Sequence, residues 1–449
     1  VTKRGIIVKK QILALFMGCV LLCGFSGCGK TSKATENKTT TTTVSNENLN
    51  KDKDDTDYKD IDIKQSEKSD YYTPIEIKNG YDSLQTDDQR KFYDLVLKST
   101  NSVAEEKDEN DIYPCSIVNM ENTVLTQAEI RLVITAVKED NPMLFWLTDK
   151  FGFSNTEGYT AIQLYSYEPP EKIKTMQNKL NKEVNKFINS VEYGLDDFSL
   201  ELLAHDYIID RCKYDDDVKD SDDDYLAFTP YGAIVNGNAV CEGYAKAFGY
   251  LLSQLGIESK GIVGKGSQEL HMWNAVKIEG NWYYTDISWD DGKEYSRYDY
   301  FNITESQLKK DHTISKVYSK CSSDEVNGTN GVKAINFNFS VPECDSTEEN
   351  YYVKKAVHFT DLYSYQNDEM TNALYNAANN KEKYFHIYID PVYLEYNGAV
   401  DQLFVSGDQL FFTYIDTVNS MYPSNYIDKS GVSIIKKENL SIVTVKLSY

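Results

Sequence analysis

The sequence NGNAVCEGYAKAFGYLLSQL at residues 236–255 predicts a helix with one apolar face. Its apolar side chains recur at helical spacing, at positions 240, 244, 247, 248, 251, 252 and 255. Asn238 is the expected N-cap because its short polar side chain can accept a hydrogen bond from the first turn. Cys241 then falls in that turn, where backbone amides and the helix dipole favour a thiolate. An isolated helical cysteine is otherwise a small buried hydrophobe, so its interpretation depends on its partners.

Two runs rich in β-branched and aromatic residues follow, on either side of Glu279 and Gly280, and predict a β-hairpin. If these two residues form the whole turn, Trp273 lies opposite Asp286, and His271 lies diagonal to Asp286 on the same face. Diagonal partners are about 7–8 Å apart at the backbone, so a carboxylate can reach an imidazole. A loop of odd length would instead place them on opposite faces.

Three residue types needed for nucleophilic catalysis therefore occur in order. Cys241 can act as the nucleophile, His271 as its base, and Asp286 as the carboxylate that holds the imidazole in one tautomer. These are the predicted catalytic residues.

The segments Ala239–Ala245, His271–Asn274 and Trp282–Asp291 resemble the bacterial transglutaminase-like domain, as found in exported proteins of Firmicutes. The resemblance is strongest from about Ser199 to Gly292. It implies an α+β fold with a papain-like core, in which the nucleophile helix packs on an antiparallel sheet that carries the histidine and the aspartate.

Position by position, the resemblance assigns the nucleophile, base and orienting carboxylate to the same cysteine, histidine and aspartate. It does not identify the donor of the oxyanion hole, for which Tyr231, Asn236 and Asn238 are candidates.

The N-terminus is typical of an export signal. Four basic residues precede an apolar run, Ile12–Leu22, which is shorter than the roughly 20 residues of a membrane span. Ser26-Gly27-Cys28 then resembles a bacterial lipoprotein signal, which implies removal of residues 1–27 and lipidation of Cys28. The alternative is an ordinary signal peptide. The expected location is the outer face of the cytoplasmic membrane, with the chain held there by a lipid anchor.

The rest of the chain is expected to form a tether and three folded parts. Residues 28–72 are polar and predict a disordered tether. The folded parts are a mainly helical N-terminal region (73–195), a transglutaminase-like catalytic domain (196–320) and a small α+β C-terminal domain (345–449).

Composition excludes several classes of function. A formal charge of −23 repels phosphate backbones, so the sequence predicts no nucleic-acid partner. Eight scattered cysteines suit neither a disulfide scaffold nor a zinc or iron–sulfur site, although Cys321 and Cys344 could pair. The acidic stretch Asp215–Asp224 lacks the order of an EF-hand and predicts a solvated loop, with a calcium site as the alternative. No metal and no cofactor are expected.

Two functions remain open. The first is an extracytoplasmic thiol enzyme that acts on amide bonds of a protein or peptide substrate, cell-wall peptide among the candidates, through a thioester. The second is a noncatalytic surface module that keeps the fold. Trp273, Trp282 and Trp289 could line a substrate tunnel, but packing is the favoured interpretation. His205 and His312 are interpreted as structural rather than as groups behind the catalytic residues.

Overall fold

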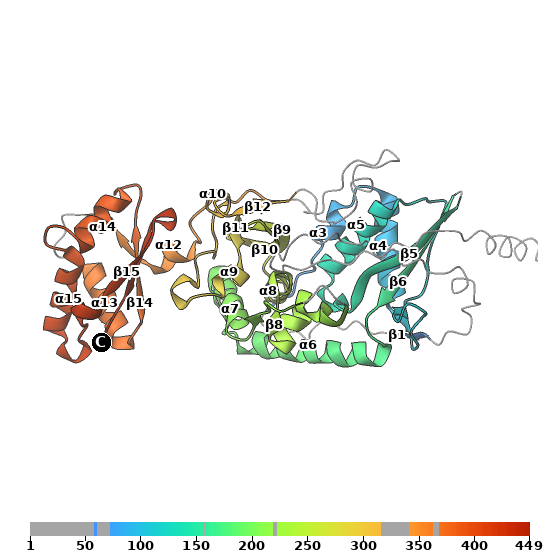
Figure 1. Ribbon diagram of the computed structural model, residues 1–449, viewed down its shortest axis with the longest axis horizontal. Coiled ribbons are helices and arrows are strands. Elements are labelled where there is room, and N and C mark those ends of the chain that lie inside the picture. Colours follow the sequence, from blue (N-terminus) through green and yellow to red (C-terminus); the bar gives the residue numbers. More distant parts are fainter. Residues whose placement is uncertain (1–57, 61–71, 157, 219–221, 316–340, 362–367) are drawn as a thin grey trace, which may run out of the picture. The chain divides into compact units, whose positions relative to one another are not determined.

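The structure is a computed structural model that describes residues 58–60, 72–156, 158–218, 222–315, 341–361 and 368–449. The predicted signal, Cys28, most of the tether and Cys321 lie outside these residues. Within them, no helix combines the length and the apolar composition needed to cross a membrane. The chain divides into two compact units, Val1–Gly280 with Asp311–Pro342, and Asn281–Lys310 with Glu343–Tyr449 (Figure 1).

The first unit begins with helices and a small sheet. The helices are α3 (Asn79–Ser83), α4 (Asp87–Thr100), α5 (Gln127–Asp140) and α6 (Pro170–Ser190). The sheet has the order β3-β6-β4, with β5 also paired to β6; its strands are β3 (Tyr113–Pro114), β4 (Val118–Glu121), β5 (Leu147–Thr156) and β6 (Tyr159–Ser166).

The predicted helices of this region are present, and α4 and α5 each begin with a capping box, from Thr86 and Thr126. The region also contains the sheet described above, whose strand β5 follows a 3₁₀ turn at Pro142–Leu144. One element differs from the prediction. Residues 58–60, which were assigned to the disordered tether, form β1 (Tyr58–Asp60) against β2 (Ser102–Ala104), where Lys59 pairs with Glu105.

The later part of the first unit contains α7 (Asp197–Ile209), α8 (Cys241–Leu255), β9 (Ser259–Gly266), β10 (Glu269–Ile278) and β12 (His312–Ile314). Strands β9, β10 and β12 belong to a sheet of order β11-β10-β9-β12. Helix α8 packs on β10 and β9 (Figure 1). The Asn274 amide donates to the Ala245 carbonyl at 3.1 Å, and Ala245, Val263 and Met272 form a buried apolar cluster. The predicted α+β arrangement, a nucleophile helix on an antiparallel sheet, is confirmed.

The turn between β10 and β11 (Asn281–Thr285) contains two residues, as predicted. Glu279 and Gly280 both have positive φ, 49° and 86°, which is the backbone that a two-residue type I′ hairpin requires.

The predicted N-cap of α8, Asn238, is wrong. Helix α7 is capped by Asp196, which accepts the backbone N–H of Ser199. Helix α8 has Val240 at its N-cap and no side-chain cap. Asn238 lies before it in β8 (Asn238–Ala239), where the parallel partner β7 (Lys213–Tyr214) and a hydrogen bond to Asp215 hold it.

The second unit contains β11, α9 (Ile287–Asp290), α10 (Glu305–Leu308) and an α+β C-terminal part. The sheet of that part has the order β13-β14-β16-β15, with strands β13 (Val357–Phe359), β14 (Tyr384–Ile389), β15 (Ser433–Lys437) and β16 (Ile442–Lys446). Its helices are α12 (Tyr351–Lys355), α13 (Asp368–Asn380), α14 (Tyr396–Phe404) and α15 (Leu410–Met421). One hydrophobic core joins this sheet to α13, α14 and α15.

Candidate functional site

Cys241 is the first residue of α8 and is 4% exposed. The N–H of Val240, just before it, donates to the Ala227 carbonyl at 3.0 Å, and Val240 accepts the N–H of Tyr244 at 3.1 Å. Because no side chain caps this helix end, the amides of the first turn direct their positive ends toward the region of the sulfur. A helix N-terminus favours a thiolate, whereas burial of the sulfur opposes one.

Gly243 explains why the first turn of α8 can occupy this place. A Cβ at position 243 would lie 2.4 Å from the Ala227 carbonyl oxygen and 2.8 Å from the Ala239 side chain. Both distances are shorter than real contacts, so only glycine lets the helix approach the preceding chain this closely.

A buried ion-pair network anchors the next turn of the helix. Lys246 lies 2.6 Å from a Glu242 oxygen and 3.6 Å from a Glu139 oxygen of α5, and all three side chains are no more than 18% exposed. Burial alone lowers the pKa of Lys246, but the charges of Glu242 and Glu139 raise it above its usual value. Burial raises the pKa of Glu139 against the opposing charge of Lys246. The charged state of each group in this network therefore depends on the charge of its partners.

His271 lies near the start of β10, opposite Gly264 of β9, and is 7% exposed. Its ring stacks on Trp273 with centroids 5.9 Å apart and an interplanar angle of 25°. This contact supports the interpretation that Trp273, which is 1% exposed, packs in the core rather than lining a tunnel.

The packing of α8 on the sheet indicates where Cys241 lies relative to His271. Ala245 contacts Met272 and Asn274 of β10. One turn further along α8, a Cβ added to Gly249 would approach the side chains of Asn274 and Ser259. Ser259 of β9 pairs with Val276 of β10. Helix and strand therefore advance in the same direction. Cys241, one turn before Ala245, therefore belongs to the end of this layer at which His271 lies, near the start of β10.

Asp286 is 1% exposed at the end of β11 and caps α9. Its Oδ1 accepts the N–H of Trp289 at 3.2 Å and the hydroxyl of Ser288 at 2.8 Å. Its own N–H donates to the Tyr300 carbonyl at 3.1 Å. The backbone and one carboxylate oxygen are thus fixed within the second unit.

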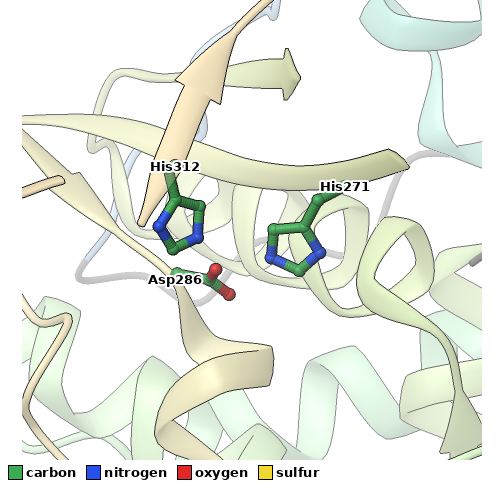
Figure 2. A group of neighbouring side chains, drawn as sticks. All are labelled: His271, Asp286 and His312. Carbon is green, nitrogen blue, oxygen red and sulfur yellow. The ribbon is translucent and has the colours of Figure 1, made fainter. Parts of the chain in front are cut away.

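Figure 2 shows the imidazoles of His271 and His312 beside one another. Both side chains are buried. His271 belongs to the first unit and Asp286 to the second, and their predicted proximity stays a prediction.

His312 lies beside His271, a position that the sequence analysis did not predict. It lies on β12 opposite Gly266, its ring centroid is 5.4 Å from that of His271, and its Nδ1 is 2.6 Å from an oxygen of Asp311. The interpretation of His312 as structural stays a prediction. The Asp311-His312 pair was the sole available signal, and its partners depend on a strand pairing that spans more than 40 residues of sequence.

Residues 189–287 match the transglutaminase-like superfamily. The matched segment includes Cys241, His271 and Asp286, and ends before His312. This chain carries a transglutaminase-like domain.

Three solved structures are similar to part of the chain. One is a TGase, with 13% identity, covering 38% of this chain and 50% of that chain, at a TM-score of 0.23. A candidate cysteine protease from Cytophaga hutchinsonii has 18% identity over 31% of this chain and 61% of that chain, at a TM-score of 0.21. A candidate protease from Parabacteroides distasonis has 8% identity over 30% of this chain and 35% of that chain, at a TM-score of 0.21. The chain thus spans between a third and two thirds of these proteins. No curated protein matches the sequence.

The three candidates for the oxyanion donor lie in the segment that precedes α8. Tyr231 is 5% exposed and stacks on Phe145. Asn236 is exposed in a π-helical turn, and the Asn238 amide donates to Asp215. None is thereby identified as the oxyanion donor. Among the described residues, the acidic stretch supplies no close group of three potential metal ligands.

Proposed function

We propose that the transglutaminase-like domain makes this protein a thiol enzyme that acts on amide bonds. The observation that carries the proposal is the placement of Cys241 as the first residue of a buried helix that has no side-chain cap, at the end of α8 near the start of β10, where His271 lies. In this proposal Asp286 is the acceptor that holds the tautomer of His271, because a base needs such a partner.

In the proposed reaction the Cys241 thiolate attacks the amide carbonyl carbon, and first-turn amides of α8 stabilise the oxyanion. The C–N bond then breaks, and the amine leaves with a proton from His271. This step yields an acyl thioester on the sulfur. Water or a second amine next attacks the thioester, gives its proton back to His271, and restores the thiolate. Asp286 orients the imidazole throughout.

Hydrolysis would make the protein a peptidase or amidase, and transfer to an amine would make it a crosslinking enzyme. The choice depends on how well the acyl site excludes water and accepts an amine. We propose a protein or peptide substrate outside the cytoplasm, with cell-wall peptide as a candidate. Export and lipidation at Cys28 are part of the proposal; a Cys28→Ala chain should leave the membrane fraction, and firm retention would contradict lipid anchoring.

The test incubates the full chain with a glutamine-containing peptide, with and without a primary amine, and follows both products and intact protein mass. We expect an acyl adduct on Cys241, its loss in Cys241→Ala, and its persistence in Cys212→Ala, which removes another buried cysteine. Water or amine products then distinguish the two reactions. A chain that forms no adduct with peptide substrates, and whose Cys241 reacts with thiol electrophiles only after denaturation, would instead support the noncatalytic module.

A further inference from the structure

A buried lysine of the C-terminal part contacts the loop that follows α9. Lys437 is the last residue of β15 and is 7% exposed. Its Nζ lies 2.6 Å from Oδ1 of Asp299 and also donates to the Tyr295 carbonyl. The Tyr352 hydroxyl accepts from the same Nζ at 3.0 Å and donates to the same Asp299 oxygen at 2.5 Å. Lys437 and Tyr352 therefore hold this loop together at Asp299.

Burial makes the two charges of this link depend on each other. Burial lowers the pKa of Lys437, and the charge of Asp299 opposes that shift. The side chain of Asp299 is 19% exposed. Loss of either partner would leave the other charge desolvated and without its main counter-charge, which is costly in a protein interior. The loop and β15 are thus strongly joined as long as both charges are present.

The same loop holds the backbone of Asp286. Tyr300 directly follows Asp299, and its carbonyl accepts the Asp286 N–H at 3.1 Å. The N–H of Tyr300 donates to Oδ1 of Asp290 at 2.9 Å, and the N–H of Asp290 donates to the Asp286 carbonyl at 3.1 Å. Asp290 is 1% exposed. These three hydrogen bonds fix Asp286 relative to Tyr300, and hence relative to the residue that Lys437 holds.

The core sheet of the C-terminal part holds Lys437 itself. Lys437 pairs with Ile442 of β16, and its N–H donates to the Tyr396 hydroxyl at 3.1 Å. That hydroxyl donates in turn to the Ile442 carbonyl at 2.8 Å. Tyr396 and β16 belong to the hydrophobic core that also includes α13, α14 and α15. Every contact from this core to Asp286 lies within the second unit.

We infer that Lys437 is a positioning residue through which the C-terminal part fixes the backbone of Asp286 and the direction of its carboxylate. The inference deepens the proposed function and rests on it, because Asp286 affects the reaction only as the acceptor for His271. The C-terminal part then contributes to the chemistry of Cys241 without supplying a catalytic residue.

The first measurement is hydrogen exchange of the full chain, followed in peptides that span residues 286–300. In Lys437→Met, the amides of Asp286 and Tyr300 should exchange about 10–100-fold faster, because the link loses its hydrogen bonds to a charged group. Tyr352→Phe should act in the same direction and less strongly, and it keeps the test decisive if Lys437→Met does not fold. The rates are compared with those of α15, in the core of the same part, so that an overall loss of stability is not mistaken for a local one.

The chain offers a matched control at the same loop. Lys383 precedes β14 and pairs with Glu294, but these side chains are 52% and 60% exposed. Such an exposed pair contributes little to stability. Lys383→Met should therefore leave hydrogen exchange at residues 286–300 unchanged.

The second measurement is the pH midpoint of Cys241 alkylation. Lys437→Met should raise the midpoint in the same direction as Asp286→Asn, and by less. In an Asp286→Asn background, Lys437→Met should add no further shift, because a residue that acts through this carboxylate has no effect once the carboxylate is gone. A purely structural role would give additive shifts.

Exchange that is unchanged in both Lys437→Met and Tyr352→Phe, or equally accelerated in Lys383→Met, would overturn the link. A midpoint that Asp286→Asn raises but Lys437→Met leaves unchanged would overturn the positioning role and leave the proposed function intact. Faster exchange, with a midpoint that neither Asp286→Asn nor His271→Ala changes, would instead reject the thiol enzyme and retain the link.

Discussion

Replacing Lys246 with Met tests how strongly α8 depends on its buried charges. The substitution keeps most of the side-chain volume but leaves the Glu242 and Glu139 carboxylates, 15% and 18% exposed, without their cation. Removing one partner of a buried ion pair costs about 3–5 kcal/mol, since the remaining charge is still desolvated. We expect a loss of that size in the free energy of unfolding, or roughly 6–20 °C in midpoint for a domain of 150–250 residues.

The assay is urea unfolding of the full chain, followed by tryptophan fluorescence. Lys277→Met is the matched control, because Lys277 lies 3.0 Å from Glu258 with side chains 39% and 45% exposed. Such an exposed pair contributes about 0–1 kcal/mol. A second variant that joins Lys246→Met to Glu139→Gln and Glu242→Gln should regain much of the loss, since it no longer buries unpaired carboxylates.

The pH dependence gives an independent check. Burial already raises the pKa of Glu139, and loss of Lys246 raises it further. A carboxyl with a raised folded-state pKa destabilises the fold as pH rises through the interval between its unfolded and folded values. The deficit of Lys246→Met should therefore shrink at about pH 5 relative to about pH 8. A deficit below about 1 kcal/mol, or one that glutamine does not relieve, would refute this account of the network.

Three further substitutions probe the surroundings. Burial raises the pKa of Asp140 to about 7 from 3.8. The contribution of Asp140 to stability is therefore complete below about pH 4 and declines by about 4 kcal/mol as the pH rises toward 7. Asp140→Asn should flatten that part of the curve of unfolding free energy against pH. Gly243→Ala places a carbon 2.4 Å from the Ala227 oxygen, so both the unfolding midpoint and the rate of nucleophile alkylation should fall. Asn274→Ala removes a 3.1 Å bond to the Ala245 carbonyl and should cost about 1 kcal/mol in urea unfolding.

The parts of the site that the sequence predicts are those governed by local rules. The two-residue turn at Glu279 and Gly280 is one of them, because both residues have the positive φ that a type I′ hairpin requires. Apolar spacing predicts α8 and places Cys241 in its first turn.

The N-cap of α8 could not be predicted from local preference alone. Asn238 has a favoured side chain for capping, but its backbone pairs in β8 and its amide donates to Asp215, 23 residues earlier. A tertiary contact thus outcompetes the local preference, and the helix begins two residues later than expected.

His312 escaped prediction for a similar reason. Its place beside His271 depends on the pairing of the three-residue strand β12 with β9, from which more than 40 residues separate it. Short strands carry little periodicity, so no local pattern indicates this pairing. The same holds for β1, whose polar sequence is typical of a tether but which pairs with β2.

The most direct test of the central claim is the pH dependence of Cys241 alkylation by iodoacetamide, measured by mass spectrometry of the peptide that contains it. We predict a midpoint well below the roughly 8.5 of an ordinary cysteine, a rise toward that value in His271→Ala, and a smaller rise in Asp286→Asn, which keeps the Oδ1 cap of α9. His205→Gln should leave the profile unchanged. A midpoint that stays the same in His271→Ala, or a Cys241 that reacts only in denaturant, would show that this cysteine is a core residue and not a nucleophile.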